Sequence, residues 1–551
     1  MTAGRTMVDI SLDEVRALVE RTKGLLTDED HEQLARLVDT LIELTRLVRQ
    51  KGTTIARLRR LFGLSTTEKT EAVLDNGAST DSDGEDQTDT STDGTDEGGE
   101  ASDGKQKKRR KGHGRIPTSD YDAEHIPVPH DELHAGDVCP CCARGRLCSL
   151  EPAQWLRIFG QPPLTGKCWD CERMRCATCG EVFTARAPEE AQGPKYDESA
   201  ASMMGLLRYG TGLPLFRLGR LQQLLGIPVP PSTQWEVVAG RLPALLPVYE
   251  ALLRCAATGS VVHNDDTYMR ILELMGKRRA KLLAKGELPD PDRTGLFTTA
   301  IVSVTTMGPI AMFFTGRKHA GENLTTLLDD RPDGLEQPIH MCDGLDRNRP
   351  KEREVVESNC LAHGRRHIVD EAENFPSECR HVLEQLREVF HNEAVCKEQG
   401  WSGQERLEFH QQHSAPIMED LQAWMKAQFA DKRIEPNSGL GDAFKYLLKR
   451  WHQLTLFLRV ADAPMDNNLC ERVIKMAIKH RKNSYFYKTQ RGARVGDIYM
   501  TLIYTAELAG ENPFEYLTAI LRHETMAAAA PDEWLPWSYR ATLARLVPEA
   551  A

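Results

Sequence analysis

The sequence predicts a multidomain protein of mixed α and α/β class, and three observations lead to this prediction. Its 551 residues are too many for a single hydrophobic core. Apolar residues follow helical spacing near the N-terminus and in the second half of the chain, whereas short β-branched and aromatic runs separated by turns fill residues 258–343. Eight of the fourteen cysteines lie between residues 139 and 179, which indicates a separate small module.

Composition argues against a membrane protein and against a secreted one. No apolar run approaches the roughly 18 residues of a transmembrane helix, and the N-terminus has no basic segment followed by an apolar one. We therefore expect a cytoplasmic protein with no membrane partner. The net charge of −11 equals the charge of residues 75–104, which hold eight Asp, three Glu and no Lys or Arg. The rest of the chain is balanced, so clustered basic residues remain available for nucleic acid.

The N-terminal part, residues 1–70, is expected to be helical and leucine-rich. Its segment 28–62 has apolar residues in two heptad series, interrupted at Lys51: Leu34, Leu41, Val48, Ile55 and Phe62, and then Leu37, Leu44 and Leu58. This spacing predicts a coiled-coil dimerisation segment, and an amphipathic helix packed on its own chain is the alternative.

Residues 71–112 are expected to be a disordered linker that is first acidic and then basic. The acidic part contains no aromatic residue, so it cannot bury enough apolar surface to offset chain entropy. Its basic end offers four candidate contacts to DNA phosphates: Lys107, Lys108, Arg109 and Arg110. Pairing with the acidic tract is the alternative role of this cluster.

Residues 113–190 are predicted to form a zinc-binding module. Two CxxC knuckles, Cys139/Cys142 and Cys176/Cys179, supply the four thiolates that a structural Zn²⁺ takes in tetrahedral geometry. Cys168/Cys171 is a competing knuckle. We prefer Cys176/Cys179, because a Gly follows the second cysteine where the knuckle turn needs a positive φ.

Residues 191–250 are predicted to be helical, with a candidate helix-turn-helix for DNA. An amphipathic stretch from Leu218 to Leu225 is followed by a Gly-Ile-Pro turn and by a helix that starts near Ser232. An ordinary helical hairpin fits the same pattern.

The segment 251–500 is predicted to be an RNase H-like, or retroviral-integrase-like, core. Four strand-like runs (VVHND, TYMRILEL, FTTAIVSV, IAMFFT) precede a helix near 321–329 and the strand PIHMCD. We interpret them as the order strand, strand, strand, helix, strand, which has one strand fewer than there are runs before the helix. Residues of about 366–450 are helical and charged, which indicates an inserted helical subdomain. Residues 501–551 are expected to form a C-terminal helical region.

Three acidic residues, Asp265, Asp343 and Glu471, lie where such a core brings its elements together. The first two follow apolar strand segments, and Glu471 lies at a helix start. Carboxylates that meet at one point hold paired Mg²⁺ ions for phosphodiester chemistry, with Mn²⁺ as a substitute. Each acid alone is equally explained as a turn or cap residue. Asp466 is the alternative third acid.

Basic residues flank these acids and are candidate DNA contacts. One group comprises His363, Arg365, Arg366 and His367, and a second comprises Lys475, Lys479, Arg481, Lys482, Lys488, Arg491 and Arg494, interleaved with Tyr485, Phe486 and Tyr487. Lys475 and Lys479 share one helix face beyond Glu471, because they are four residues apart. A solvated helix face with core aromatics is the alternative to DNA contact.

Eight sequence blocks together resemble one family, the IS66-type insertion-sequence transposases. In order, they are LFG followed by Glu68-Lys69, KGHGR, CPCC, HNDDT, CDG, CLAHGRRH, PMDNNLCER and ENPFEYL. The resemblance implies a DDE transposase with catalytic, Mg²⁺-binding residues Asp265, Asp343 and Glu471. At the first acid the family pattern is Asp-Glu-Thr, whereas this chain has Asp265-Asp266-Thr267, so Asp266 is the alternative first acid.

The resemblance further implies the partners and place of action of the protein. They are the terminal inverted repeats of the element, target DNA, a second copy of the chain and accessory proteins of the same element, at the nucleoid of a bacterial cytoplasm. A non-catalytic zinc and helix-turn-helix regulator, an inactivated transposase derivative and an RNase H-type nuclease that does not join DNA are the alternatives.

Overall fold

The computed structural model describes residues 161–175 and 182–546 except Pro289, together with a few single positions between 31 and 146. The chain divides into two compact units, one of Met1–Thr80 with Lys167–Ala551 and one of Asp81–Gly166. Outside the described residues lie most of the predicted coiled-coil segment, the linker, and these candidate ligands: Cys139, Cys142, Cys176, Cys179, Lys107, Lys108, Arg109 and Arg110. The zinc module and the coiled coil therefore stay predictions.

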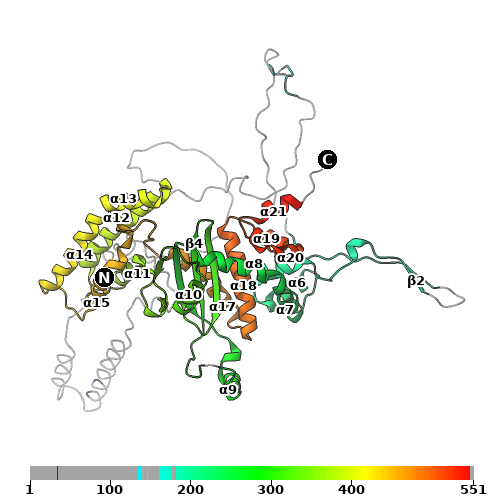
Figure 1. The fold of residues 1–551 in the computed structure, drawn as a ribbon, viewed down its shortest axis with the longest axis horizontal. Helices are drawn as coiled ribbons and strands as arrows, with labels where there is room; N and C mark the ends of the chain where they lie inside the picture. The colour runs from blue at the N-terminus through cyan, green and yellow to red at the C-terminus, as the bar shows by residue number, and fades with distance from the viewer. Residues whose placement is uncertain are drawn as a thin grey trace. The chain divides into compact units, whose positions relative to one another are not determined.

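A five-stranded mixed sheet lies at the centre of the first unit (Figure 1). Its strands are β3 (Val261–Tyr268), β4 (Phe297–Thr305), β5 (Gly308–Gly316), β6 (Ile339–Cys342) and β7 (Val356–Asn359), in the order β5-β4-β3-β6-β7. The first three strands are antiparallel, whereas β6 runs parallel to β3 and β7 parallel to β6. The sequence predicted the order up to β6, and it missed β7.

Two details of the sheet differ from the sequence prediction. TYMRILEL is not a separate strand, because its first residues complete β3 and its last three form the 3₁₀ helix η4 (Leu272–Leu274). Asp265 is therefore not the end of its strand: pairing with β4 continues to Tyr268, whereas pairing with β6 stops at His263. β3 can continue beyond β6 because its pairing with β4 alone supplies the hydrogen bonds of its last five residues.

Helices cover both faces of the sheet. Helices α8 (Leu242–Ala257) and α10 (Ala320–Asp329) pack on one face, and α17 (Asn468–Ser484) packs on the other, against β3 and β4. Side chains alternate between faces along a strand, so His263, Asp265 and Thr267 all point toward α17. His263 and Thr267 make hydrogen bonds there, with Asn467 and Arg481 respectively.

Helix α18 (Gln490–Leu508) covers the outer edge of β5. Three of its side chains, spaced four residues apart, accept hydrogen bonds from backbone N–H groups that β4 leaves unpaired: Thr505 from Ala311 (3.2 Å), Thr501 from Phe313 (3.1 Å) and Asp497 from Thr315 (2.7 Å). An uncovered edge would expose a row of free donors and acceptors to other chains. Covering it closes this side of the sheet.

A helical insertion separates β7 from α17. It consists of α11 (Leu361–Asp370), α12 (Pro376–Gln399), α13 (Gly403–His413), α14 (Ala415–Ala430), α15 (Gly439–Lys449), α16 (Trp451–Leu454) and the 3₁₀ helix η6 (Leu456–Leu458). Figure 1 shows most of these helices in yellow. Val261 and Ile339 of the sheet belong to the same apolar cluster as Leu383 and Phe444 of the insertion. Sheet and insertion therefore share a core.

Further helices flank the sheet domain. Before β3 lie η2 (Glu189–Ala191), α5 (Glu198–Gly205), the π-helical turn η3 (Leu206–Gly210), α6 (Leu215–Leu224) and α7 (Pro231–Gly240), and between strands lie α9 (Gly276–Ala284) and η5 (Asp346–Asn348). After α18 come α19 (Pro513–Arg522), α20 (Glu524–Ala529), η7 (Pro531–Trp534) and α21 (Tyr539–Leu546), and β1 (Arg173–Arg175) pairs with β2 (Val182–Thr184). None of the described helices has the length and apolar character needed to cross a membrane.

The α6–α7 pair is the candidate helix-turn-helix, and one detail of its prediction is wrong. Helix α7 starts at Pro231 with Pro230 as N-cap, so Ser232 lies inside the first turn and does not cap it. Proline fits the first helical position because it has no N–H to satisfy there. On α6, Leu218 is buried, whereas Leu224 is 67% exposed.

Candidate active site

The strand register brings Asp265 and Asp343 together. Parallel pairing of β3 with β6 aligns Val261 with Ile339 and His263 with Met341. Asp265 and Asp343 each lie two residues beyond the last of these pairs, so continuing the register puts them side by side on one face. That face is the one covered by α17.

Asp266, the alternative first acid, points to the opposite face. Its carboxylate lies 3.0 Å from His319 Nδ1 at the start of α10 and 3.3 Å from Arg347 Nη2, and its side chain is 1% exposed. These partners satisfy the charge of Asp266 within the protein. Asp265 is consequently the acid of this pair that faces Asp343.

Asp265 lies in an environment that opposes a negative charge. Burial raises its pKa most, and the charge of Asp343 adds to this, with smaller contributions from Asp266 and Glu471. A hydrogen bond from the Asp266 N–H (2.8 Å) acts the other way, yet the pKa of Asp265 rises to about 7. Several carboxylates this close together need a positive charge to be stable when ionised.

Asp343 is held in place from one side. Its Oδ1 accepts hydrogen bonds from Asn348 Nδ2 (2.8 Å) and from the Leu345 N–H (3.0 Å), and its backbone oxygen accepts one from the Tyr446 hydroxyl (2.9 Å). These bonds fix the carboxylate orientation. Within the described residues they leave Oδ2 free for a ligand.

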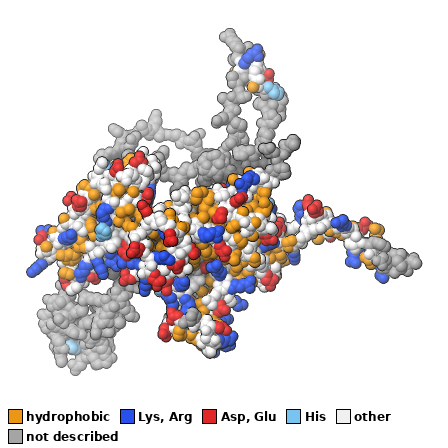
Figure 2. Space-filling view, viewed as in Figure 1, with side chains coloured by type: hydrophobic (Ala, Val, Ile, Leu, Met, Phe, Trp, Pro, Cys, Tyr) orange, Lys and Arg blue, Asp and Glu red, His pale blue; other side chains and the backbone are white. Residues whose placement is uncertain are grey.

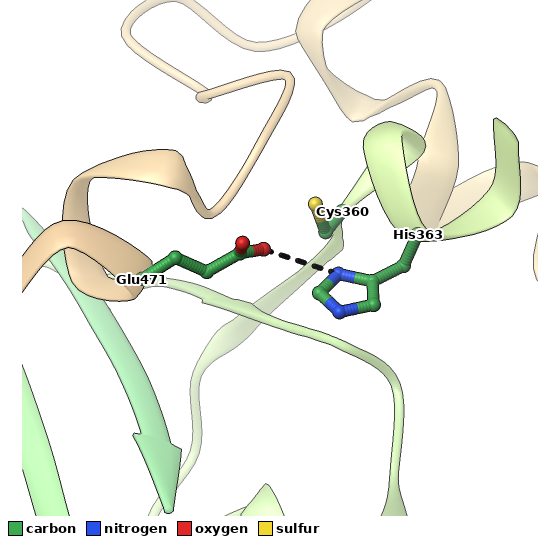
Figure 3. A group of neighbouring side chains, drawn as sticks. All are labelled: Cys360, His363 and Glu471. Atoms are coloured by element: carbon green, nitrogen blue, oxygen red, sulfur yellow. Dashed lines mark ion pairs between the residues drawn. The ribbon is translucent and has the colours of Figure 1, made fainter. Parts of the chain in front are cut away.

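Glu471 reaches the site from the first turn of α17. Asn467, which precedes this helix, ties it to β3 through His263 Nδ1 (3.0 Å) and the Asn264 carbonyl (3.1 Å). Figure 3 shows the Glu471 carboxylate directed at the His363 ring of α11, with Oε1 3.5 Å from Nδ1 and the Cys360 thiol beside them. Glu471 Oε1 and His363 Nδ1 are both buried, and neither has a hydrogen-bond partner among the described residues.

Asp466, the alternative third acid, has a different role in the geometry. Its Oδ1 accepts a hydrogen bond from the Asn468 N–H (3.0 Å), which suits a residue at the start of α17. The charges of both Asp466 and Glu471 act on Cys360, but that of Asp466 also acts on His263, whereas that of Glu471 acts on Asp265. The geometry therefore groups Glu471 with Asp265 and Asp343.

Comparison with known proteins matches this same region. The family model described as Transposase IS66 family covers residues 195–495, which is more than half of the chain and includes all three acids. The chain belongs to the IS66 transposase family. Two relatives from Sinorhizobium fredii bear the names "Uncharacterized protein y4jD" and "Uncharacterized protein y4hP". The first is 26% identical over 67% of this chain and 71% of the relative, and the second is 25% identical over 75% of each.

A cleft of about 710 Å³ opens beside Glu471 in this IS66-family chain. It lies between α12–α13 and the start of α17, and Glu471, Asp466 and His263 line it, whereas Asp265 and Asp343 do not. Its basic lining residues are Lys397, Arg406, Arg472 and Lys475. Of these, only Lys475 was predicted from the sequence; Lys397 and Arg406 become its neighbours only when the insertion folds against α17, and Arg472 next to Glu471 was overlooked.

The structure separates the predicted DNA-binding residues of this family member into two kinds. Lys475, Lys479, Lys482 and Arg491 are exposed. Arg481, by contrast, donates to Thr267 Oγ1 and to the Tyr268 carbonyl, both at 2.7 Å, and Arg365 and Arg366 are half-buried with partners of their own. His363, a candidate phosphate contact, faces Glu471.

Proposed function

We propose that this chain is a DDE transposase with an RNase H-like core, which cuts the ends of an insertion sequence and joins them to target DNA. Membership of the IS66 transposase family supports the activity. The sheet supports the core, since three antiparallel strands are followed by a helix and two parallel strands in the order β5-β4-β3-β6-β7.

One observation carries the proposal: Asp265 on β3, Asp343 just after β6 and Glu471 on α17 converge, and among the described residues no basic side chain pairs with Asp265. Burial is the main cause that raises the pKa of Asp265 to about 7, and the negative charges of Asp343, Asp266 and Glu471 add to it. Carboxylate oxygens are ligands that Mg²⁺ and Mn²⁺ prefer, and Glu471 Oε1 is a buried acceptor that receives no hydrogen bond from any described residue. These residues fit a site for two such ions.

The residues of the chain have distinct roles in the proposed reaction. Asp265 and Asp343 would hold the ions from the sheet, and Glu471 would complete the site from α17. Bound there, the two ions would activate the attacking oxygen and stabilise the leaving 3′ oxygen. Water attacks the phosphodiester at the element end and frees a 3′-OH, and this hydroxyl then attacks a target phosphodiester. Lys475 and Lys479, exposed on α17, suit the DNA backbone beside the site.

The remaining parts of the proposal concern regions around the core. Structural Zn²⁺ would bind Cys139, Cys142, Cys176 and Cys179, and α6–α7 would contribute to recognition of the terminal inverted repeats. We further propose a homo-oligomer as the active form, because two element ends must be joined in one event, with accessory proteins of the same element as additional partners.

The deciding experiment supplies the purified full chain with pre-cut element ends, a supercoiled plasmid and Mg²⁺ or Mn²⁺. A transposase yields plasmid joined to the element end, and this product depends on Asp343. An RNase H-type nuclease cuts without joining. A DNA-binding regulator or an inactivated derivative yields neither product, and that result would refute the proposed function.

A further inference from the structure

Helix α9 forms part of an arm that leaves the sheet between two paired strands. β3 and β4 pair without interruption from Val261–Val304 to Tyr268–Phe297, and the chain between them, residues 269–296, makes the excursion that carries η4 and α9. None of the residues of α9 is buried. Figure 1 shows α9 projecting from the sheet. The sequence analysis did not single out this segment.

Helix α9 and the two residues after it are strongly basic. Between Gly276 and Gly286 there are five cationic residues and no acidic one: Lys277, Arg278, Arg279, Lys281 and Lys285. Lys277, Lys281 and Lys285 are four residues apart, so they lie along one face, where like charges destabilise an isolated helix. Lys and Arg side chains are visible on the arm in Figure 2. A helix of this kind gains stability from a polyanion.

Only part of this charge is used inside the protein. Arg279 donates to the Pro291 carbonyl and so braces the arm, and Lys285 lies 3.6 Å from Glu287. Lys277, Arg278 and Lys281 are exposed, and within the described part of the chain no carboxylate pairs with them. Three cations therefore remain available for an external anion.

The base of the arm is fixed to the helix that carries Glu471. The Leu272 N–H donates to the Tyr487 carbonyl (2.9 Å), and the Tyr487 N–H donates to the Arg270 carbonyl (2.8 Å), just beyond the end of α17. Exposed cations mark α17 between Glu471 and this junction: Arg472, Lys475, Lys479 and Lys482. A basic track thus runs along α17 from the acidic site to the arm.

The length of this track matches a short stretch of duplex. At about 1.5 Å per residue, α17 spans about 20 Å from Glu471 to Ser484. This equals about six base pairs of B-DNA at roughly 3.4 Å per pair, or about half a helical turn.

We propose that α9 clamps the backbone of duplex DNA, with Lys277, Arg278 and Lys281 on phosphates about half a turn from the phosphodiester held at Asp265, Asp343 and Glu471. This inference rests on the proposed function for the position of the cut, whereas binding by α9 is testable without any cleavage. The bound duplex is either the element end or the target, because both present the same backbone.

The test compares full-length wild type with the triple variant K277A/R278A/K281A. The matched control is K426A/K432A/K449A, which removes three exposed charges from the helical insertion. DNA binding is measured in Ca²⁺ over a series of KCl concentrations, so that the result does not depend on cleavage. Two duplexes of equal length are compared, one with the terminal repeat and one of unrelated sequence. Each phosphate contact steepens the slope of log K against log[KCl] by about 0.9. Because the arm variant lacks three such contacts, its slope should be shallower than that of the wild type by about 2.7.

The outcomes separate the two sources of DNA and the two proposals. A loss confined to the terminal-repeat duplex assigns the arm to the element end, and a loss confined to the unrelated duplex assigns it to the target. Terminal-repeat duplexes truncated to fewer than about six base pairs on each side of the cut are too short to reach the arm. The arm variant and the wild type should therefore bind them with equal affinity. Equal slopes for arm variant and control on both duplexes would overturn the clamp, whereas unchanged joining by Asp343→Asn would overturn only the catalytic proposal.

Discussion

Two groups of the same residue types, Cys, His and Glu, lie in different parts of this chain and differ in how their polar atoms are paired. In the helical insertion, Glu393 lies 2.7 Å from Arg406 Nε, 3.0 Å from His410 Nε2 and 3.1 Å from Lys397 Nζ. Every oxygen of this buried carboxylate has a partner. The group is therefore a closed network that supports the packing of α12 on α13.

The second group, Cys360, His363 and Glu471, is open. Glu471 Oε1 and His363 Nδ1 are buried, and neither atom has a hydrogen bond within the part of the chain that the structure describes. The buried carboxylates of the two regions also differ in pKa. Burial alone would raise the pKa of Glu393, but His410, Arg406 and Lys397 outweigh it and lower the value to about 2. Asp265, beside Glu471, has a pKa of about 7. Burial therefore does not distinguish the two sites, because both hold buried carboxylates. What distinguishes a structural acid from a candidate metal ligand is whether cationic side chains pair with it.

The largest effect is expected when an acid is removed from the open site. Asp343→Asn should abolish end cleavage and joining, by about 10³-fold or more, because a lost metal ligand removes several kcal/mol of transition-state stabilisation. Folding should be preserved, since the variant also removes charge repulsion with Asp265. The control is Asp346→Asn, three residues away and 98% exposed, which should retain activity. Joining by Asp343→Asn at the wild-type rate would contradict the assignment.

Neutralising the closed site should instead damage the fold. Glu393→Gln leaves the Arg406 and Lys397 charges without their counterion, and we expect a loss of about 3 kcal/mol in the free energy of unfolding. Glu398→Gln, exposed on the same helix, should change it little. Urea denaturation of the three proteins measures both effects. An unaltered unfolding midpoint in Glu393→Gln would show that the network is not structural.

The destabilisation caused by Glu393→Gln should become smaller as the pH is lowered. The folded pKa of Glu393, about 2, is below the unfolded value of about 4.5, so its stabilisation is complete above pH 4.5 and disappears as the pH falls toward 2. The difference in unfolding free energy between wild type and Glu393→Gln should therefore shrink from pH 5 to pH 3. A difference that stays constant over this range would contradict the lowered pKa.

Divalent cations should distinguish the two sites directly. Mg²⁺ at about one hundred times its dissociation constant should stabilise the wild type by about 2.7 kcal/mol, which is visible as a higher melting temperature. Glu393→Gln should keep this gain, whereas Asp265→Asn and Glu471→Gln should lose most of it. If all the variants gained equally, the cation would be binding elsewhere.

Much of the fold was predictable because its signals are local. The β-branched runs predicted β4 and β5, and Asp343 was correctly placed just beyond β6 because it directly follows an apolar run. Strand β7 was missed because VESN is short and polar, and its pairing with β6 spans a loop.

The candidate site was predictable only in its residue types. The contact between His363 and Glu471 joins residues more than a hundred positions apart, so no spacing rule reveals it. The same holds for Asp266, whose partners His319 and Arg347 come from elements after the hairpin. Because Asp265 and Asp266 are adjacent in the sequence, either could have been assigned as the first acid. In the structure their side chains point to opposite faces of β3, and only Asp265 faces Asp343.

The smallest predicted effect concerns His363, which we expect to position Glu471. Its ring lies 3.5 Å from Glu471 Oε1 and has no other recorded partner for Nδ1 within the described residues. His363→Gln should raise the half-saturating Mg²⁺ concentration for joining by about tenfold, as the loss of a group supporting a ligand commonly does. At saturating Mg²⁺ most of the joining rate should return, which a merely destabilised fold would not show.

The control for His363 lies one turn further along α11. His367 packs on the Tyr446 ring, with centroids 4.3 Å apart, and forms no ion pair with Glu471 within the described residues. His367→Gln should therefore leave the Mg²⁺ requirement unchanged. If both histidine variants shifted the Mg²⁺ requirement equally, the effect would belong to α11 as a whole. If neither did, Glu471 would be held by α17 alone, and the open site would need only the three acids.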